Sequence, residues 1–346
     1  MASGAKPLVF VTGAAGLLGS EIVYQLLEAG YSVRGAARGR KLPLLKTAFA
    51  SYPRFEAVEI LDVASSDFTA AFKGVDAVIH TAAPLPGRTD HGTVLNTAIV
   101  GSLHIIREAH KAGIKKFVST STMLTFPPNE YGPDDWTPIT KEQAVQGTPI
   151  DVYIAEKKFS DQAVLEFADQ HPEMDVTIFC PPWIFGPSAP GFEHIVPEPD
   201  FVSFSTNGFV YQLLRPENTN YIYFPGLIDV RDVARIHVAA LNPLTDDHPK
   251  RVPMASPYQS DFRDAIQYIF DELPELRARL ADPNTVPRWP TYQVDLDPSP
   301  VEKAFGINSY KTWKETVLDA VDRFLDIEKQ WTDKGLKFEV PSMPPV

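Results

Sequence analysis

A tyrosine and a lysine lie four residues apart in the segment Tyr153-Ile154-Ala155-Glu156-Lys157. On a helix, this spacing places the phenol and the ammonium on one face. An ordinary tyrosine has a pKa near 10, which is too high for efficient proton exchange at neutral pH. A fixed ammonium nearby favours the phenolate and lowers that pKa, so the pair predicts acid–base chemistry. The alternative is a solvated helix face, on which the same spacing often occurs.

Hydroxyl side chains close the expected fifth strand in the segment Val118-Ser119-Thr120-Ser121-Thr122. At the C-terminal end of a strand in a parallel sheet, such groups face the crevice in which ligands bind. A hydroxyl donor there can polarise a carbonyl group that the tyrosine protonates. The alternative is a turn in which these hydroxyls bond to their own backbone.

Glycines recur at every third position in TGAAGLLG, residues 12–19, between an expected strand and an expected helix. Glycine is needed where the backbone passes close to a pyrophosphate and where a helix meets a strand tightly. The helix N-terminus then presents unpaired N–H groups to the anion. A tight strand–helix turn without a ligand is the alternative, but the position after an N-terminal strand favours a dinucleotide.

Basic residues replace the expected acid at the end of the second strand. Enzymes that prefer NAD place an acidic residue there to accept from the ribose 2′-hydroxyl, yet no Asp or Glu occurs between Glu28 and Glu56. A guanidinium paired with a 2′-phosphate explains this pattern, whereas a solvated basic helix face is the alternative. We therefore predict NADP(H) as cofactor, with Arg38 as its main contact. The six basic residues of the interval are Arg34, Arg38, Arg40, Lys41, Lys46 and Arg54.

Asp62 and Val63 follow the expected third strand. A carboxylate and a backbone group at this place could hold the adenine edge of the cofactor. On spacing alone, Asp62 fits the N-cap of a surface helix nearly as well.

The first 180 residues alternate apolar runs with stretches of helical periodicity, which are the elements that must position these groups. This alternation predicts an α/β fold, a Rossmann-type doubly wound parallel sheet. The expected strands are residues 8–11, 32–37, 57–61, 77–80, 116–119 and 176–180. The expected helices are residues 20–29, 94–112, 152–169, 230–241, 262–270 and 313–325.

Proline marks a change of character along the chain, because 3 of the 32 prolines fall in residues 1–83 and 29 in the rest. Residues 181–200 contain six of them and should not form a regular helix or a central strand. We expect residues 1–185 to form the NADP-binding domain, with residues 225–255 returning to it. Residues 186–224 and 256–346 should form a smaller, partly discontinuous C-terminal substrate lobe.

Composition excludes several classes of protein. The formal net charge of −12 argues against binding to nucleic acid or to an anionic membrane. The single cysteine, Cys180, excludes an intrachain disulfide and should be a small buried apolar side chain. No clustered histidine spacing suggests a metal site; His80 should be a satisfied core residue, and His194 could line the substrate pocket. No apolar run is long enough for a membrane span, so we expect a soluble, cytoplasmic monomer or homodimer.

In this order and spacing, TGAAGLLG, VSTST and YIAEK resemble the extended short-chain dehydrogenase/reductase family. Within it, the chain is most similar to the dihydroflavonol-reductase-like group and the yeast carbonyl or methylglyoxal reductases. AARGRK resembles their NADP-binding turn, and CPPWIFGP, LIDVRDVARIHVAAL and FGINSYKTWKETVLDAVD resemble later segments. The resemblance covers most of the chain. It implies NADPH-dependent reduction of a small ketone or aldehyde to an alcohol by hydride transfer.

The resemblance also implies a role for each matching position. Thr122 would hold the substrate carbonyl, with Ser121 in its place if the register slips by one. Tyr153 would be the proton donor, and Lys157 would bind the nicotinamide ribose and lower the tyrosine pKa. The residues expected at the cofactor are Gly13, Ala15, Gly16, Leu17, Leu18, Arg38, Asp62, Val63, Thr81, Ala82, Ala83, Thr120, Tyr153, Lys157, Pro181 and Ile184.

Two positions depart from the family pattern. Glu156 replaces the small serine that frequently precedes the lysine, and Ala98 stands where many relatives have an asparagine that supports it. The alanine at position 98 puts the family's proton relay in doubt.

Two other functions compete with carbonyl reduction. A sugar-nucleotide epimerase or dehydratase of the same superfamily is one, but such dehydratases place Asp-Glu after the catalytic threonine, where this chain has Met123-Leu124. A non-catalytic NADP-sensing protein is the other, although such sensors typically lack the YxxxK pair. The substrate would be selected by the lobe after Pro181, whose loops follow no recognisable motif.

Overall fold

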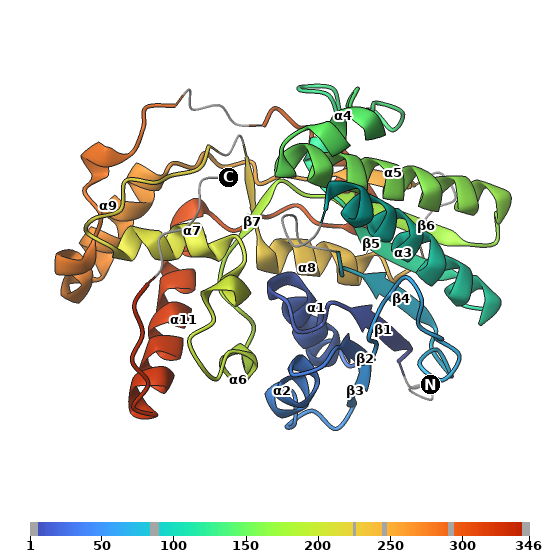
Figure 1. Cartoon of the computed structure of the whole chain (residues 1–346), viewed down its shortest axis with the longest axis horizontal. Coiled ribbons are helices and arrows are strands. Elements are labelled where there is room, and N and C mark those ends of the chain that lie inside the picture. The colour runs from blue at the N-terminus through green and yellow to red at the C-terminus, as the bar shows by residue number, and fades with distance from the viewer. Residues whose placement is uncertain (1–5, 84–89, 224–225, 244–247, 290–293, 341–346) are drawn as a thin grey trace.

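A parallel sheet forms the centre of the chain (Figure 1). The computed structural model describes residues 6–83, 90–223, 226–243, 248–289 and 294–340. Its main strands are β1 Leu8–Thr12, β2 Ser32–Ala37, β3 Phe55–Glu59, β4 Ala77–His80, β5 Lys116–Thr120, β6 Asp175–Cys180 and β9 Arg251–Pro253. They lie in the order β3-β2-β1-β4-β5-β6-β9, and each neighbouring pair is parallel. The predicted doubly wound α/β sheet is confirmed.

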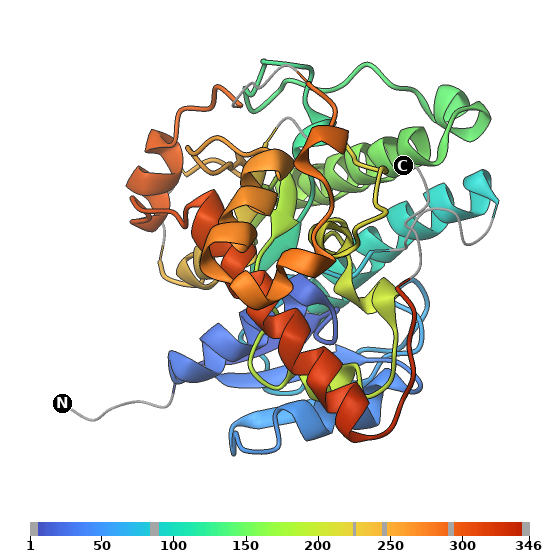
Figure 2. The ribbon, with the colours of Figure 1, turned by 90° about the vertical axis from the view of Figure 1, so that its left-hand side faces the viewer.

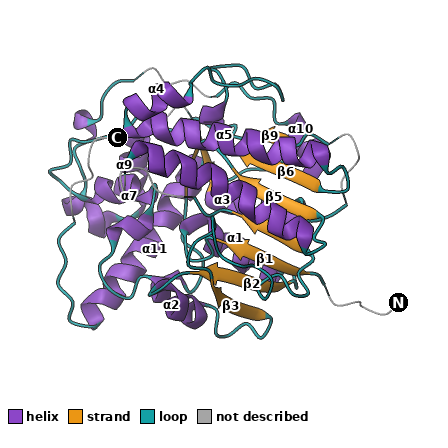
Figure 3. Cartoon of the chain, turned by 45° about the vertical axis from the view of Figure 1, so that its right-hand side comes forward, coloured by secondary structure: helices purple, strands orange, loops and turns teal. Residues whose placement is uncertain are grey.

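Helices cover both faces of this sheet. On one face, α3 (His91–Lys111) and α5 (Pro149–Gln170) lie side by side (Figure 3). On the other face, α1 (Leu17–Glu28) packs against α8 (Val230–Ala239). The remaining helices are α2 Lys41–Ala48, α4 Lys141–Gln146, α6 Phe192–Ile195, α7 Asn207–Tyr211, α9 Phe262–Glu272, α10 Ser299–Phe305 and α11 Trp313–Asp333. Short 3₁₀ turns are Met123–Thr125, Phe201–Phe204, Gln212–Leu214, Pro274–Arg279 and Pro283–Thr285.

The side chains of β1 show why this strand is a continuous apolar run. Val9 and Val11 belong to the apolar cluster that includes α1 and α8, whereas Phe10 belongs to the cluster that includes α3 and α5. All three side chains are fully buried. Because both faces of a parallel sheet are covered, successive residues of a central strand are apolar on either side.

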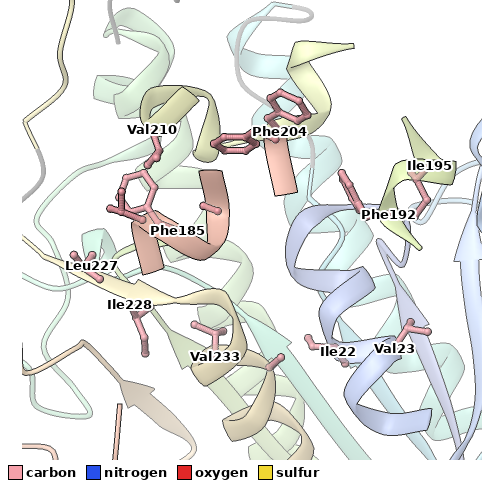
Figure 4. Packing of buried hydrophobic residues seen from close by; sticks show 14 of the residues in the cluster. Ile22, Val23, Phe185, Phe192, Ile195, Phe204, Val210, Leu227, Ile228 and Val233 are labelled. Atoms are coloured by element: carbon pink, nitrogen blue, oxygen red, sulfur yellow. The ribbon is translucent and has the colours of Figure 1, made fainter. Parts of the chain in front are cut away.

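The C-terminal part of the chain packs on the sheet through one continuous apolar cluster. Figure 4 shows Phe192 and Ile195 of α6 close to α1, which carries Ile22 and Val23, and all four belong to that cluster. The long helix α11 crosses this part of the molecule (Figure 2), and its Trp331 Nε1 donates to a backbone carbonyl at 2.8 Å. The proposed domain division stays a prediction. In agreement with it, β9 lies beside β6 in the main sheet.

The third strand differs from its predicted bounds. It spans Phe55–Glu59 instead of residues 57–61, and Leu61 is 65% exposed. The reason is the length of β2, whose last residue, Ala37, already pairs with Glu59. The sequence analysis also missed β9 and the two-stranded pair of β7 (Trp183–Phe185) and β8 (Leu227–Asp229). These strands have three residues each, which is too short for a periodic pattern.

The described residues contain no helix that combines the length and the apolar character needed to cross a membrane.

Candidate active site

Thr12, at the end of β1, connects this strand to the end of β4. Its Oγ1 accepts the backbone N–H groups of Thr81 at 3.0 Å and Ala82 at 3.1 Å. With both lone pairs used, its O–H donates to Nδ1 of His80 at 2.8 Å. Burial, assisted by the Lys157 charge, lowers the pKa of His80 to about 3. His80 is therefore neutral, and the expectation of a satisfied core histidine is confirmed.

The glycine turn leaves no room for side chains at two positions. Gly13 has a φ of +66°, and a Cβ there would come 2.7 Å from Thr81 Oγ1. A Cβ on Gly19 would come 2.1 Å from the carbonyl oxygen of Gly13. Gly16 is the N-cap of α1, whose first turn has no side-chain cap and no acidic residue. These open N–H groups fit the pyrophosphate of a dinucleotide. The turn also contains the predicted cofactor residues Ala15, Leu17 and Leu18, of which Leu17 is buried.

Helix α5 brings the predicted lysine to the end of β5. The helix begins with a capping box, in which the Thr148 hydroxyl accepts the Asp151 N–H and the Asp151 carboxylate accepts the Thr148 N–H. Pro149 in its first turn is also typical of a helix start. Lys157 Nζ donates to the carbonyl oxygen of Thr120 at 3.1 Å. The ammonium and the last residue of β5 are therefore in direct contact.

Three polar side chains at successive turns of α5 share one face, namely Tyr153, Lys157 and Asp161. Lys157 bonds to the carbonyl of Thr120, and Asp161 accepts the hydroxyl of Ser121. This face thus contacts the end of β5, and Tyr153 lies on it one helical turn before Lys157. Tyr153 is half-buried, and its hydroxyl has no hydrogen-bond partner among the described residues. It remains able to bond to a ligand.

The two candidate hydroxyls after β5 differ in their availability. The Ser121 hydroxyl donates to Asp161, whose burial raises the pKa of its carboxyl to about 7. The Thr122 Oγ1 accepts the backbone N–H of Leu124 at 3.3 Å, which leaves its own O–H unused. This difference favours Thr122 over Ser121 as a donor to a substrate carbonyl.

The Thr120 hydroxyl is engaged with α8. Nδ1 of His237 donates to the carbonyl oxygen of Val233 at 2.8 Å, so its Nε2 accepts from the Thr120 hydroxyl at 2.9 Å. Burial lowers the pKa of His237 to about 4, which keeps the ring neutral. The carbonyl of Pro181 accepts the N–H of Met123 at 2.9 Å and brings Pro181 to the hydroxyl run. The sequence analysis did not identify His237, because nothing in the local sequence shows its contact with β5.

Arg38 is one of three basic residues of the predicted cluster, with Lys46 and Arg54, whose exposed side chains have no partner among the described residues. Arg38 is the nearest of the three to the end of β2. Arg34 is held by a carboxylate of β3 and by two loop carbonyls. Arg40 and Lys41 both lie within ion-pair distance of Asp200. The exposed side chain of Arg38 forms no hydrogen bond or ion pair with the described part of the chain. Its guanidinium can therefore bind a phosphate.

Two carboxylates also lie at or after the C-terminal end of β3, next to the end of β2. Glu59 ends β3 and accepts the Gly39 N–H at 3.2 Å. Asp62 accepts the Ser65 hydroxyl at 2.6 Å and a backbone N–H two residues on at 3.0 Å. These bonds, with the Arg38 charge as a weaker cause, hold the pKa of Asp62 below its usual range. The interval between Glu28 and Glu56 contains no acidic residue, but Glu59 of the neighbouring strand β3 lies close to its residue Gly39.

Two charged side chains near the candidate residues are buried. The Arg251 guanidinium lies between the rings of Phe126 and Trp136, 3.5 and 3.6 Å from their centroids. Glu156 has no exposed surface, and its two carboxylate oxygens have no hydrogen-bond partner among the described residues. Burial raises the pKa of Glu156 to about 7, although the Lys157 charge opposes this. The departure from the family pattern thus places an unsatisfied carboxyl beside the predicted lysine.

The remaining predicted residues take no part in the contacts described above. Val63 follows β3, Ala83 is exposed after β4, and Ile184 lies in β7. The His194 side chain is 47% exposed and lies 3.7 Å from the Glu193 carboxylate. The binding and catalytic roles of all these residues stay predictions. Cys180 is fully buried, as expected.

Comparisons with known proteins agree with this geometry. The model of the NAD dependent epimerase/dehydratase family matches residues 9–254. An uncharacterized oxidoreductase of Schizosaccharomyces pombe is 33% identical over an alignment of 254 positions, which covers 68% of this chain and 73% of that protein. The NADPH-dependent methylglyoxal reductase of Saccharomyces cerevisiae is 27% identical over an alignment of 350 positions including gaps, which covers 92% of this chain and 98% of that protein. The crystal structure of yeast methylglyoxal/isovaleraldehyde reductase complexed with NADPH is 25% identical, with a TM-score of 0.77 over 93% of this chain and 99% of that chain. The chain therefore belongs to the NAD dependent epimerase/dehydratase family, and its predicted resemblance to the extended short-chain dehydrogenases/reductases is confirmed.

Proposed function

We propose that this protein is an oxidoreductase that reduces a ketone or aldehyde to an alcohol with NADPH. The observation that supports this most is the hydrogen bond from Lys157 Nζ to the carbonyl of Thr120. It places the Tyr153–Lys157 face of α5 at the end of β5. The glycine turn and the end of β4 lie at the same C-terminal ends of the parallel strands.

NADPH, when bound, supplies a hydride to the carbonyl carbon. The Thr122 O–H donates to the carbonyl oxygen and stabilises the negative charge that develops on it. The Tyr153 hydroxyl gives its proton to the same oxygen, which completes the alcohol. The ammonium of Lys157 lies one turn from Tyr153 and favours the phenolate that this transfer leaves.

The cofactor assignment rests on the glycine turn and on Arg38. The first-turn N–H groups of α1 would hold the pyrophosphate, and Arg38 would pair with the 2′-phosphate. The names of the relatives support NADPH, since the yeast methylglyoxal reductase is called NADPH-dependent. The monomeric or dimeric state and the cytoplasmic location stay predictions.

Tyr153→Phe tests the proposal. The variant should lose NADPH oxidation with every carbonyl in a panel of aliphatic, aryl and 2-keto substrates. NADPH binding, followed by the fluorescence of the nicotinamide, should persist. Tyr52→Phe is the matched control, because the Tyr52 hydroxyl bonds to Glu28, away from β5. Near-normal turnover by Tyr153→Phe would contradict the mechanism. An absence of turnover by the wild-type protein with the whole panel would favour an epimerase or a sensor.

A further inference from the structure

Three potential metal ligands lie together at the C-terminal ends of α3 and α5. The candidate active site lies at the other end of α5. His110 lies in the last turn of α3, His171 is the C-cap of α5, and Glu173 follows in the loop before β6. The two helices run side by side (Figures 1 and 3), so their ends meet. One ligand atom from each of the three side chains lies within 4.8 Å of the other two.

Both imidazoles lie within ion-pair distance of one Glu173 oxygen, and His110 forms a hydrogen bond with it. His110 Nε2 is 2.6 Å and His171 Nδ1 is 3.6 Å from the same Glu173 oxygen, Oε1. Ligands around a tetrahedral zinc ion with bonds of about 2.0–2.1 Å lie about 3.3 Å apart. The Glu173 side chain is 45% exposed, so a small rotation can equalise the two distances.

Local packing fixes the two imidazole rings. Their centroids are 4.2 Å apart, and Phe167 contacts both rings, at 4.2 Å from His171 and 5.7 Å from His110. The backbone of His171 is held on both sides, because its N–H donates to the Ala168 carbonyl and its own carbonyl accepts the Met174 N–H. The two nitrogen ligands are therefore positioned before any ion arrives.

The chemistry of the ligands selects the ion. Two imidazole nitrogens and one carboxylate oxygen suit zinc and similar first-row divalent ions, whereas magnesium and calcium prefer oxygen ligands. The C-terminal ends of two helices carry partial negative charge, which also favours a cation.

We propose that His110, His171 and Glu173 bind one Zn²⁺ ion, with water completing its coordination, and that the ion clamps the C-terminal ends of α3 and α5. His171 is 14 residues after Lys157 on α5, which is about 20 Å along a helix. The ion would therefore stabilise the helix pair and take no part in carbonyl reduction. The expectation of no metal site came from local histidine spacing, whereas His110 and His171 are 61 residues apart in sequence.

Zinc titration of the untagged, chelator-treated full chain tests this site. A competing chromophoric chelator reports affinity and stoichiometry, and thermal unfolding reports stability. The wild-type chain should bind close to one zinc ion and unfold at a higher temperature with it. His110→Ala, His171→Ala and Glu173→Gln should each weaken binding by more than about 10-fold, the smallest loss expected when even a partner of a metal ligand is changed.

Matched controls separate this site from general surface binding. His91→Gln removes a histidine at the other end of α3, and Asp169→Asn removes a carboxylate near the site that pairs with Lys250. Both variants should bind zinc as the wild type does, and Mg²⁺ at the same concentration should not compete. Equal zinc binding by the wild type and the His110→Ala/His171→Ala double variant would overturn the proposal. Zinc binding without an increase in melting temperature would overturn the clamp.

Discussion

The buried carboxyl of Glu156 should make the stability of the protein depend on pH. Glu156 has no exposed surface and no hydrogen-bond partner among the described residues. Burial raises its pKa from the ordinary value of 4.5 to about 7. The folded state therefore binds this proton more tightly than the unfolded state does. The resulting stabilisation is fully present below pH 4.5 and is lost as the pH rises through about 7.

The size of this effect follows from the pKa. Each tenfold change in proton affinity is worth about 1.4 kcal/mol, so a rise from 4.5 to about 7 corresponds to about 3 kcal/mol. Glu156→Gln keeps the shape of the side chain and removes the titration. The buried amide costs about 1–3 kcal/mol if it stays unbonded, but this cost does not change with pH. The slope of stability against pH, and not its absolute value, therefore tests the reasoning.

Urea unfolding followed by tryptophan fluorescence, repeated between about pH 5 and pH 8, measures this slope. Over that range the wild type should lose about 2–3 kcal/mol more unfolding free energy than Glu156→Gln. Asp161 also has a raised pKa, but it titrates in both proteins and cancels in the comparison. Glu166→Gln is the matched control, because Glu166 is exposed on the same helix, and its profile should follow that of the wild type. Parallel profiles for Glu156→Gln and the wild type would refute the reasoning.

Three further predictions concern the cofactor site. Gly19→Ala should destabilise the protein by about 2 kcal/mol or more and weaken NADPH binding, because the new Cβ would come 2.1 Å from the Gly13 carbonyl oxygen. The control Gly92→Ala, also in a helix but with ordinary contacts, should be tolerated. Equal melting temperatures of the two variants would contradict this prediction. Arg38→Ala should raise the KM for NADPH roughly 10- to 100-fold, the value of a charge-assisted hydrogen bond, and leave that for NADH unchanged. Glu59→Gln should lower the KM for NADPH several-fold at low salt, since it removes a negative charge near the expected phosphate; an equal effect on NADH would argue against both assignments.

The local sequence was sufficient to predict the elements that carry the candidate chemistry. The spacing of Tyr153 and Lys157 needs only helical periodicity, and the strand before Thr122, expected at residues 116–119, spans Lys116–Thr120. The glycines of residues 12–19 mark a close backbone approach that the structure confirms at Gly13 and Gly19. These features are local, because each depends on residues within one or two turns.

Contacts between distant segments could not be predicted in the same way. Ser121 and Asp161 are 40 residues apart, and Thr120 and His237 are 117 apart. Such pairs depend on how α5 and α8 pack against β5, and no spacing rule encodes that packing. The short strands β7, β8 and β9 were missed for a related reason, since their pairing partners and not their own residues make them strands.

The sequence by itself determined the fold class, the glycine turn and the Tyr–Lys face, because periodicity and backbone sterics act over a few neighbouring residues. Tertiary structure decided which of the polar groups are available. It pairs the Ser121 hydroxyl with Asp161 and leaves the Arg38 side chain unpaired among the described residues. It also brings Glu59 next to Gly39, close to the end of β2. Burial and partner choice are properties of the packed chain, since a side chain loses water and gains a hydrogen bond only when distant segments close around it.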